Sequence, residues 1–431
     1  MRLTRAPGLS PAASLGPAGL SRFRHRASGL TAPARIRLFG CVSVSRVLIC
    51  GGGIAGTMTA LALAKAGIGS VVYEAHRAGA DDIGAFLVIM RNGQDALRAV
   101  DAALVVQDRS CPAREITVYL GTGEFRGRRQ IGGQGEDAVP AWTLTRATLY
   151  RALQDELIRR GGRIEHGKRL AAATARAGGV AVRFTDGTAA EGDLLVGADG
   201  LRSAVRRMLD PAAPEPRYTG LNVVYGYSPA GPFEAAPHGY RMTYGQRAYF
   251  GYTTVPDGGT WWFARIPADE VDRDELAAMT PARWQDRALG FFVGDETPSA
   301  DIIRCADEVY GLNAYDLPHV PVWQNGLMVL AGDAAHAASP AAGQGASMAA
   351  EDGVILAKCL RDVPGARRAL ATYEMLRRPR TEHLVAASGS QSNTIAELTA
   401  AMAAAPPASS PSWPAEHPVA WDHPIIPGTR T

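Results

Sequence analysis

Residues 46–56 read RVLICGGGIAG, and this stretch decides the fold of the chain. A short apolar run, typical of a buried parallel strand, leads into glycines at positions 51, 53 and 56, in the spacing GxGxxG. Residues 54–66 are rich in Ala and Leu and predict a helix that Gly67 ends. The first glycine permits a tight turn, the second lets a pyrophosphate approach the backbone, and the third packs the helix against the sheet. We therefore expect a phosphate-binding turn at a helix N-terminus.

A carboxylate follows at the distance that a nucleotide ribose requires. Residues 70–74 (SVVYE) predict a second strand, and Glu74 lies 18 residues after Gly56. A carboxylate at this position accepts hydrogen bonds from both ribose hydroxyls of an ADP group and repels a 2′-phosphate. Strand, helix and strand form a βαβ unit that predicts dinucleotide binding, although this unit alone does not separate FAD from NAD.

Two more motifs follow predicted strands. Residues 197–203 read GADGLRS after an apolar run, and residues 332–346 read GDAAHAASPAAGQGA after the buried strand predicted at 327–331. Asp333 would end that strand, where an ionised carboxylate needs donors such as the hydroxyls of a sugar-alcohol chain. The helix expected from about Gly343 presents a positive dipole end, which suits the negative edge of a reduced flavin.

The pattern changes between residues 218 and 266, where aromatic and β-branched residues alternate as in an antiparallel sheet. The predicted fold class is α/β, with a discontinuous Rossmann-like FAD/NAD(P)-binding domain and an inserted, mainly antiparallel substrate domain. The expected nucleotide domain comprises residues 44–113, 141–216 and 305–385. The expected substrate domain comprises 114–140 and 217–304, and residues 386–431 are expected to form a C-terminal helix and a Pro-rich tail.

The basic charge of the chain comes from its first 45 residues. The whole chain carries +3 at pH 7, but residues 1–45 hold seven Arg and no acidic residue. Without them, 38 Lys and Arg stand against 42 Asp and Glu, a net charge of −4. This composition fits an organelle transit peptide. It also fits a start assigned too early, with initiation near Val42 or Val44. The Arg-dominated usage of a GC-rich bacterial genome favours the second interpretation, so residues 1–43 are excluded from the fold.

Composition also excludes several kinds of partner. The five cysteines (41, 50, 111, 305 and 359) form no CxxC pair, as expected in a reducing cytoplasm without disulfides or a metal site. Residues 47–64 are uncharged and almost long enough to span a membrane, but their four glycines fit a nucleotide-binding turn better. We expect a cytoplasmic monomer or homodimer with no membrane and no nucleic-acid partner, because the body of the chain is not basic.

The three motifs in this order resemble the single-component (group A) FAD-dependent aromatic monooxygenases with the para-hydroxybenzoate hydroxylase fold, over residues 46–380. The resemblance implies FAD as cofactor, NADPH or NADH as co-substrate, and O2. In that family, O2 adds at flavin C4a to give a hydroperoxide that hydroxylates a small aromatic or polyketide-like molecule. Two alternatives stay open: a related FAD oxidoreductase (epoxidase, Baeyer–Villiger enzyme or dehydrogenase), or a flavin-binding pathway protein without turnover.

The resemblance also implies roles for individual residues. The residues expected to contact FAD are Gly51, Gly53, Ile54, Ala55, Gly56, Glu74, Arg146, Leu170, Asp199, Gly332, Asp333, Pro340, Gly343, Gly345 and Ala346. Glu74 belongs to the ADP half, Asp333 to the ribityl chain, and Arg146 opens an RxxL helix start. No convincing catalytic base emerges: His336 could merely brace its loop, and Pro340 would lie near the face where oxygen reacts.

Aromatic residues of the inserted domain are the substrate candidates. They are Tyr225, Tyr227, Tyr252 and Trp262. Aromatic side chains on antiparallel strands also form ordinary core and cross-strand pairs, so this interpretation competes with a purely structural one.

Overall fold

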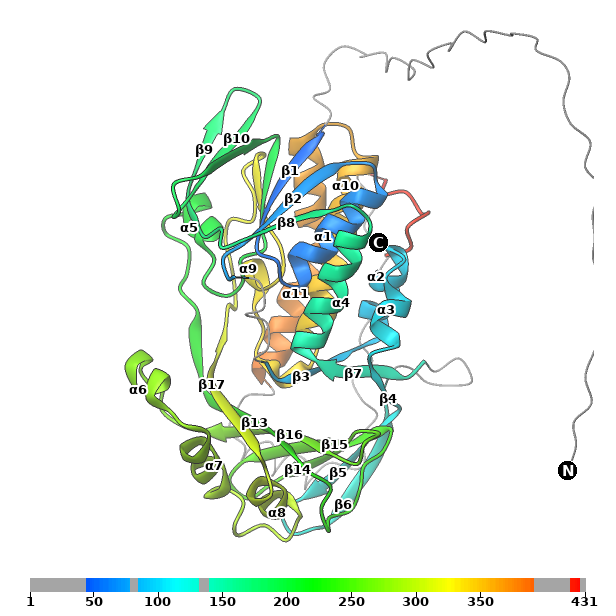
Figure 1. The fold of residues 1–431 in the computed structure, drawn as a ribbon, viewed down its shortest axis with the longest axis vertical. Helices are drawn as coiled ribbons and strands as arrows, with labels where there is room; N and C mark the ends of the chain where they lie inside the picture. The colour runs from blue at the N-terminus through cyan, green and yellow to red at the C-terminus, as the bar shows by residue number, and fades with distance from the viewer. Residues whose placement is uncertain (1–43, 78–83, 132–138, 391–418, 427–431) are drawn as a thin grey trace, which may run out of the picture. The chain divides into compact units, whose positions relative to one another are not determined.

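The computed structural model describes residues 44–77, 84–131, 139–390 and 419–426 (Figure 1). The segment expected to be a leader, 1–43, and most of the expected tail lie outside the described residues. Among the residues that are described, no helix is both long and apolar enough to cross a membrane.

The first sheet contains five parallel strands in the order β18-β12-β1-β2-β8. These strands are β1 (Arg46–Cys50), β2 (Gly69–Glu74), β8 (Arg163–His166), β12 (Leu194–Gly197) and β18 (Met328–Leu330). Val47, Leu48 and Ile49 of the central strand are fully buried. The apolar runs that predicted parallel strands therefore form the core of this sheet, as their composition requires.

Helices pack beside this sheet and against one another, with α1, α4 and α10 side by side in Figure 1. The longer ones are α1 (Ile54–Lys65), α2 (Arg91–Ala99), α4 (Arg146–Arg159), α10 (Gly345–Asp362) and α11 (Ala366–Ser390). The shorter ones are α3 (Ala103–Gln107), α5 (Ala204–Leu209), α9 (Asp333–His336) and the 3-10 turn η1 (Pro340–Ala342). A Cβ on Gly353 of α10 would lie 2.6 Å from the Thr59 nitrogen, so α10 and α1 cross with their backbones in close approach.

The second large sheet has seven strands in the order β17-β13-β16-β15-β14-β5-β6, and only its β14·β5 pair is parallel. Its strands are β5 (Glu115–Leu120), β6 (Phe125–Gln130), β13 (Arg217–Ser228), β14 (Gly239–Tyr244), β15 (Tyr249–Thr254), β16 (Thr260–Pro267) and β17 (Glu308–Asp316). Helices α6 (Arg273–Ala278), α7 (Pro281–Leu289) and α8 (Ser299–Arg304) lie between β16 and β17 in the chain.

One strand of this sheet was expected in the other part of the chain. The sequence assigned residues 305–385 to the nucleotide-binding part, but β17 pairs along its length with β13 of the substrate sheet. The sequence of β17 resembles any half-buried strand, and only its pairing partner decides to which sheet it belongs. The helix expected at the start of 386–431 is the end of α11.

Two small sheets complete the described fold. One consists of β9 (Leu170–Arg176), β10 (Gly179–Phe184) and β11 (Ala189–Gly192), and the other of β3 (Phe86–Ile89), β4 (Cys111–Ala113) and β7 (Ala141–Thr145). The ring of Phe86 in β3 lies 5.8 Å from Trp261 and 5.9 Å from Phe263 on the substrate sheet. The predicted α/β fold class, with a Rossmann-type part and a second antiparallel sheet, is confirmed.

Candidate functional site

The first two motifs meet at Gly51. Its φ is +105°, and a Cβ there would lie 2.1 Å from the Ala198 carbonyl oxygen of the GADG turn. A Cβ on Gly56 would lie 1.9 Å from the Gly51 carbonyl oxygen. Both positions therefore require glycine, one for its backbone conformation and both for lack of space. The turn before α1, Gly51 to Gly53, therefore has no side chains, as a bound pyrophosphate requires.

Glu74 lies against this turn, at the end of β2. Its Oε2 accepts a 2.6 Å hydrogen bond from the Gly52 N–H, and its Oε1 accepts one of 2.8 Å from the His76 N–H. The Glu74 carbonyl accepts a hydrogen bond from the Lys168 N–H, which places the segment before Leu170 beside the same strand end. A carboxylate oxygen accepts more than one hydrogen bond, so Glu74 retains capacity for ribose hydroxyls.

Asp199 accepts hydrogen bonds from its own turn and from the start of α5. Its oxygens accept hydrogen bonds from Ser203 Oγ at 2.5 Å and from the N–H groups of Ala204 at 2.7 Å and Val205 at 3.1 Å. Burial raises the pKa of Asp199, and these hydrogen bonds oppose the rise. The side chain thus caps α5 and fixes the GADG turn against Gly51.

The third motif contacts the first at Gly332. Its φ is +63°, and a Cβ there would lie 2.8 Å from Ala55 Cβ in α1. Asp333 follows as the first residue of α9 and is partly exposed. Among the described residues, none donates a hydrogen bond to the Asp333 carboxylate, so an acceptor with no protein donor lies beside the phosphate turn.

Arg146 and Tyr150 face Asp333 from α4. Arg146 Nε donates a 2.7 Å hydrogen bond to the Tyr150 hydroxyl, and a Cβ on Gly53 would lie 3.4 Å from that hydroxyl. Burial opposes the charge of Arg146, but Tyr150 and the negative charge of Asp333 outweigh it and raise the arginine's pKa. The Arg146 side chain still reaches solvent although protein atoms surround it, as a side chain lining a concave surface does.

Tyr150 was missed in the sequence. It lies four residues after Arg146 on a helix, so the two side chains share a face, and this spacing was the available signal.

The N-terminus of α10 completes this line of motifs. Gly343 has a φ of +61°, and the N-cap Gln344 forms no side-chain capping hydrogen bond within the described chain. Gln344 Oε1 is buried without a hydrogen-bond partner among the described residues. Gly345 and Ala346 are therefore presented at a helix start whose positive dipole end suits an anionic group.

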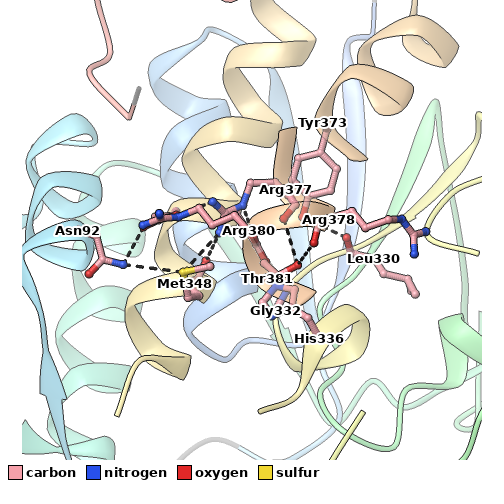
Figure 2. Close-up of polar contacts among 12 residues, drawn as sticks. Asn92, Leu330, Gly332, His336, Met348, Tyr373, Arg377, Arg378, Arg380 and Thr381 are labelled. Atoms are coloured by element: carbon pink, nitrogen blue, oxygen red, sulfur yellow. Dashed lines mark hydrogen bonds and ion pairs between the residues drawn. The ribbon is translucent and has the colours of Figure 1, made fainter. Parts of the chain in front are cut away.

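His336 points away from this surface into a buried charge network (Figure 2). Its Nε2 lies 2.6 Å from Asp352 Oδ2, its ring stacks on Trp323 with 5.7 Å between centroids, and it is only 4% exposed. Arg377 Nε donates to Asp352 Oδ1 at 2.7 Å, and Arg377 also pairs with Glu351. These contacts hold the third motif in place from its buried side.

The network is charged although it is buried. Asp352, Glu351 and Arg377 are fully buried. Burial would raise the pKa of Asp352, but His336 and Arg377 outweigh this effect and hold the pKa below its ordinary value. Asn92 of α2 and Arg380 of α11 also donate to Glu351, at 2.7 and 2.9 Å, so the network joins α2, α9, α10 and α11.

The four aromatic substrate candidates do not lie together. Tyr225 and Tyr227 lie on one face of β13, where the Tyr227 hydroxyl donates a 3.0 Å hydrogen bond to the Gly84 carbonyl beside β3. Trp262 pairs with Gly226 and Tyr252 pairs with Trp262, which places both on the opposite face. There Trp262 stacks on Phe250, and its Nε1 donates to Ser228 Oγ. The prediction that Tyr252 and Trp262 share a site with Tyr225 is therefore corrected: the strand alternation turns them into the core under α7 and α8.

Other side chains occupy the face that Tyr225 and Tyr227 share. Trp261, Phe263 and Arg265 follow from the cross-strand pairs with Tyr227, Tyr225 and Val223. Sequence reasoning missed them because it could not decide which half of an alternating strand faces the nucleotide-binding part. The alternation of side chains along a strand gives two faces but does not show which of them lies toward the nucleotide-binding part. The hydrogen bond from Tyr227 to Gly84 shows it, and the sequence does not predict that contact.

The residues present fit FAD. Gly51, Gly56 and Gly332 let the three motifs pack closely together around the start of α1, and Asp333 and Gln344 offer acceptors without protein donors in the described chain. A parallel sheet with a GxGxxG turn, joined to a second sheet with an aromatic face, defines a dinucleotide-dependent oxidoreductase.

The comparison with protein families identifies the kind of oxidoreductase. A family model described as "FAD binding domain" matches residues 44–388, and the chain belongs to this family. The chain is 33% identical to aurachin C monooxygenase/isomerase of Stigmatella aurantiaca over 79% of this chain and 87% of that protein. It is also 33% identical to 3-amino-4-hydroxybenzoate 2-monooxygenase PtnB3 of Streptomyces platensis, over 79% and 85% of the two chains.

A solved structure gives the same assignment. The crystal structure of Klebsiella pneumoniae HpxO complexed with FAD and uric acid matches with a TM-score of 0.72 and 26% identity, over 81% of this chain and 88% of that one. The predicted resemblance to group A flavin monooxygenases is confirmed, and the chain is an FAD-dependent monooxygenase. The cofactor set of FAD, NAD(P)H and O2 follows from the family.

Proposed function

We propose that this monooxygenase hydroxylates a small aromatic molecule held between the flavin and the face of the seven-stranded sheet that carries Tyr225, Tyr227, Trp261 and Phe263. One observation carries this proposal: the aromatic face lies opposite the flavin motifs, because Tyr227 bonds to Gly84 and Phe86 contacts Trp261. A flat substrate ring stacks well on such a face.

FAD, reduced by NADH or NADPH, would supply the activation of O2. The residues of the protein would bind and orient FAD. Glu74 would hold the ribose of the ADP half, the backbone around Gly53 the pyrophosphate, Asp333 the ribityl hydroxyls, and the start of α10 the flavin ring. Arg146 would complement the negative charge between these points, since its guanidinium lies near both Tyr150 and Asp333.

The two tyrosines of the aromatic face act as neutral hydroxyls in this proposal. Burial raises the pKa of Tyr225 to about 12 and that of Tyr227 further still, so both stay protonated near neutral pH. They can donate hydrogen bonds to a substrate or to the backbone but cannot accept a proton as a base. We assign no catalytic base. Pro340 stays a candidate for the wall near the reacting oxygen, and His336 is assigned to positioning.

The test uses the purified flavoprotein. NADH and NADPH oxidation is followed with a panel of phenols and aminophenols, and products are analysed by mass spectrometry for the gain of one oxygen atom. Substrate-stimulated oxidation with a hydroxylated ring supports the proposal. Flavin-containing protein that forms no oxygenated product with any aromatic would contradict it, and an epoxide or ester product would support the alternative monooxygenase outcomes.

The location of the protein, its oligomeric state and its partners belong to the same proposal. The chain would act in a reducing cytoplasm on a free small molecule, as a monomer or homodimer, without nucleic acid. Sedimentation of the flavoprotein at several concentrations decides between the two oligomeric states.

A further inference from the structure

The segment 419–426 (red in Figure 1) is fixed to the C-terminal end of α10. Lys358 Nζ donates a 2.6 Å hydrogen bond to the Ala420 carbonyl. Arg361 Nη1 donates one of 2.9 Å to the Trp421 carbonyl. Two successive carbonyl groups of the segment are therefore held by two cations of one helix.

Side chains of the same segment are buried in the core. Val419 is 7% exposed and Ile425 is 8% exposed, and both belong to the hydrophobic core that α1, α10 and the parallel sheet share. The Ile425 N–H also donates a 2.9 Å hydrogen bond to Asp362 Oδ2, at the last residue of α10. These contacts make the segment part of the folded nucleotide-binding half.

The ring of Trp421 connects α10 to α1. Lys65 Nζ lies 5.4 Å from the ring centroid, and Arg361 Cζ lies 4.6 Å from it. Lys65 is the last residue of α1, and Arg361 belongs to the last turn of α10. A cation near the face of an indole ring is attracted by the negative charge of that face. Trp421 thus links the C-terminal ends of two helices.

The same two helices begin beside the flavin motifs. Gly332 of the third motif lies between them: a Cβ there would be 2.8 Å from Ala55 Cβ in α1 and 3.7 Å from Ala349 Cβ in α10. The start of α1 follows the phosphate turn, and the start of α10 is the proposed position of the flavin ring. One FAD molecule would therefore contact both helix starts.

The two helices cross between these ends. A Cβ on Gly353 would lie 2.6 Å from the Thr59 nitrogen, and both residues lie near the middle of their helices. At about 1.5 Å per residue, each helix extends about 8–14 Å to either side of this contact. A helix in a close-packed interior moves as a rigid element, so a rotation about the crossing displaces both of its ends. A link between the C-terminal ends consequently restrains the spacing of the helix starts.

We propose that Trp421 is a positioning residue: by linking Lys65 to Arg361, it sets the spacing between the pyrophosphate site at the start of α1 and the flavin-ring site at the start of α10. This inference rests on the proposed function for the placement of FAD. A ligand that binds at two places at once depends on the distance between them, whereas a ligand that occupies one place does not. Trp421 acts through the helices and contacts neither flavin nor substrate.

The test compares a ligand that spans both helix starts with a ligand that contacts only the first. Apoprotein is titrated with FAD, measured by the quenching of flavin fluorescence, and with ADP, measured by titration calorimetry. Trp421→Ala should weaken FAD binding by about twofold to thirtyfold, the range for coupling carried by packed side chains, and should leave the ADP dissociation constant unchanged. Trp421→Phe keeps an aromatic ring, so its FAD affinity should lie between those of wild type and Trp421→Ala.

A matched control comes from the substrate half. Phe291 is also a partly buried ring with a neighbouring cation, since Arg247 Cζ lies 4.9 Å from its centroid, and it packs in the core of the substrate sheet. Phe291→Ala should bind FAD and ADP like the wild type. An equal loss of FAD affinity in this variant would overturn the proposal, because it would show a general effect of lost packing.

A second variant covers the case in which Trp421→Ala does not fold, as judged by circular dichroism. Lys65→Gln removes the cation of α1 and leaves Trp421 in place. FAD binding should weaken in this variant while ADP binding stays constant. Unchanged FAD affinity in Lys65→Gln would count against the proposal.

The outcomes separate this inference from the proposed function. Unchanged FAD affinity in Trp421→Ala overturns the role of Trp421 and leaves the placement of FAD intact. Equal weakening of FAD and ADP shows that the segment only stabilises the fold, and this result also overturns the proposal. Wild-type apoprotein that binds FAD but not ADP would contradict the placement of the ADP half at α1, and the inference with it. Hydroxylation itself is tested separately by the oxygenated products.

Discussion

The carboxylate of Asp352 accepts a 2.7 Å hydrogen bond from the backbone N–H of Gly332. Asp352 belongs to α10, and Gly332 is the residue at which the third motif leaves β18. The same carboxylate contacts His336 and Arg377, so one buried anion holds both ends of the loop that carries Asp333. The position of Asp333 therefore depends on the balance of charge among the buried side chains of Asp352, His336 and Arg377.

Arg377→Met should destabilise the protein severely. The substitution leaves Glu351 and Asp352 buried without their main cation, and breaking a buried ion pair in this way costs about 3–5 kcal/mol. Urea unfolding of the flavin-containing protein measures the loss. Arg304→Met removes an ion pair from a half-exposed helix and should cost less than about 1 kcal/mol. Equal losses in the two variants would show that the buried network contributes no more than a surface pair.

Gly56→Ala should prevent FAD binding. The new Cβ would lie 1.9 Å from the Gly51 carbonyl oxygen, so the turn must move away from the position that a pyrophosphate requires. The flavin absorbance of the purified protein, relative to its protein absorbance, measures occupancy. Gly67→Ala is the matched control. It introduces strain of about 1–2 kcal/mol at a φ of +73° but meets no atom within 4 Å, and it should retain FAD. Normal occupancy in Gly56→Ala would contradict the steric argument.

Asp333→Ala should weaken FAD binding by about tenfold to a hundredfold, because a charge-assisted hydrogen bond contributes about 1.5–3 kcal/mol. The dissociation constant is measured by the quenching of flavin fluorescence when FAD is added to the apoprotein, and circular dichroism verifies the fold. Asp301→Ala changes an exposed aspartate on α8 and should bind FAD normally. Full affinity in Asp333→Ala would refute its assignment to the ribityl chain.

Glu156 should make stability depend on pH in the acid range. Hydrogen bonds from Arg159 and Arg160 lower its pKa from 4.5 to about 2. Because the folded-state pKa lies below the unfolded one, the stabilisation is complete above pH 4.5 and is lost as pH falls toward 2. The difference in unfolding free energy between wild type and Glu156→Gln should therefore shrink over this interval. The exposed Glu275→Gln serves as control, and a difference for Glu156→Gln that does not change with pH would refute the prediction.

The nucleotide-binding half was predictable because its chemistry is local in the chain. The strand before Gly51, the helix after it and Glu74 lie within 29 residues, and each pattern has one common structural solution. The same holds for Gly332 and Asp333, where a buried strand ends at a carboxylate. These assignments needed no knowledge of partners distant in the sequence.

The substrate half was less predictable because its chemistry depends on pairing. Tyr225 and Trp262 look equivalent in the sequence, and only the register of β13 with β16 places them on opposite faces. The single-residue alternation of a strand gives two faces but does not say which one is solvent, core or site. The buried charge network around Arg377 could not be predicted for a related reason. Its members come from four helices that are distant in the sequence, α2, α9, α10 and α11.

The parallel pair of β5 and β14 has a consequence for how the chain folds. Glu115–Leu120 cannot take its place in the sheet until Gly239–Tyr244 has been synthesised, and the sheet edge at β13 then waits for β17. Contacts so distant in sequence close large loops and form slowly. During synthesis β5 can pair with β6, but its other edge stays open until β14 is made, so the nascent chain exposes an unpaired strand edge that is prone to aggregation. Expression at low temperature, or with chaperones in excess, should raise the yield of folded protein.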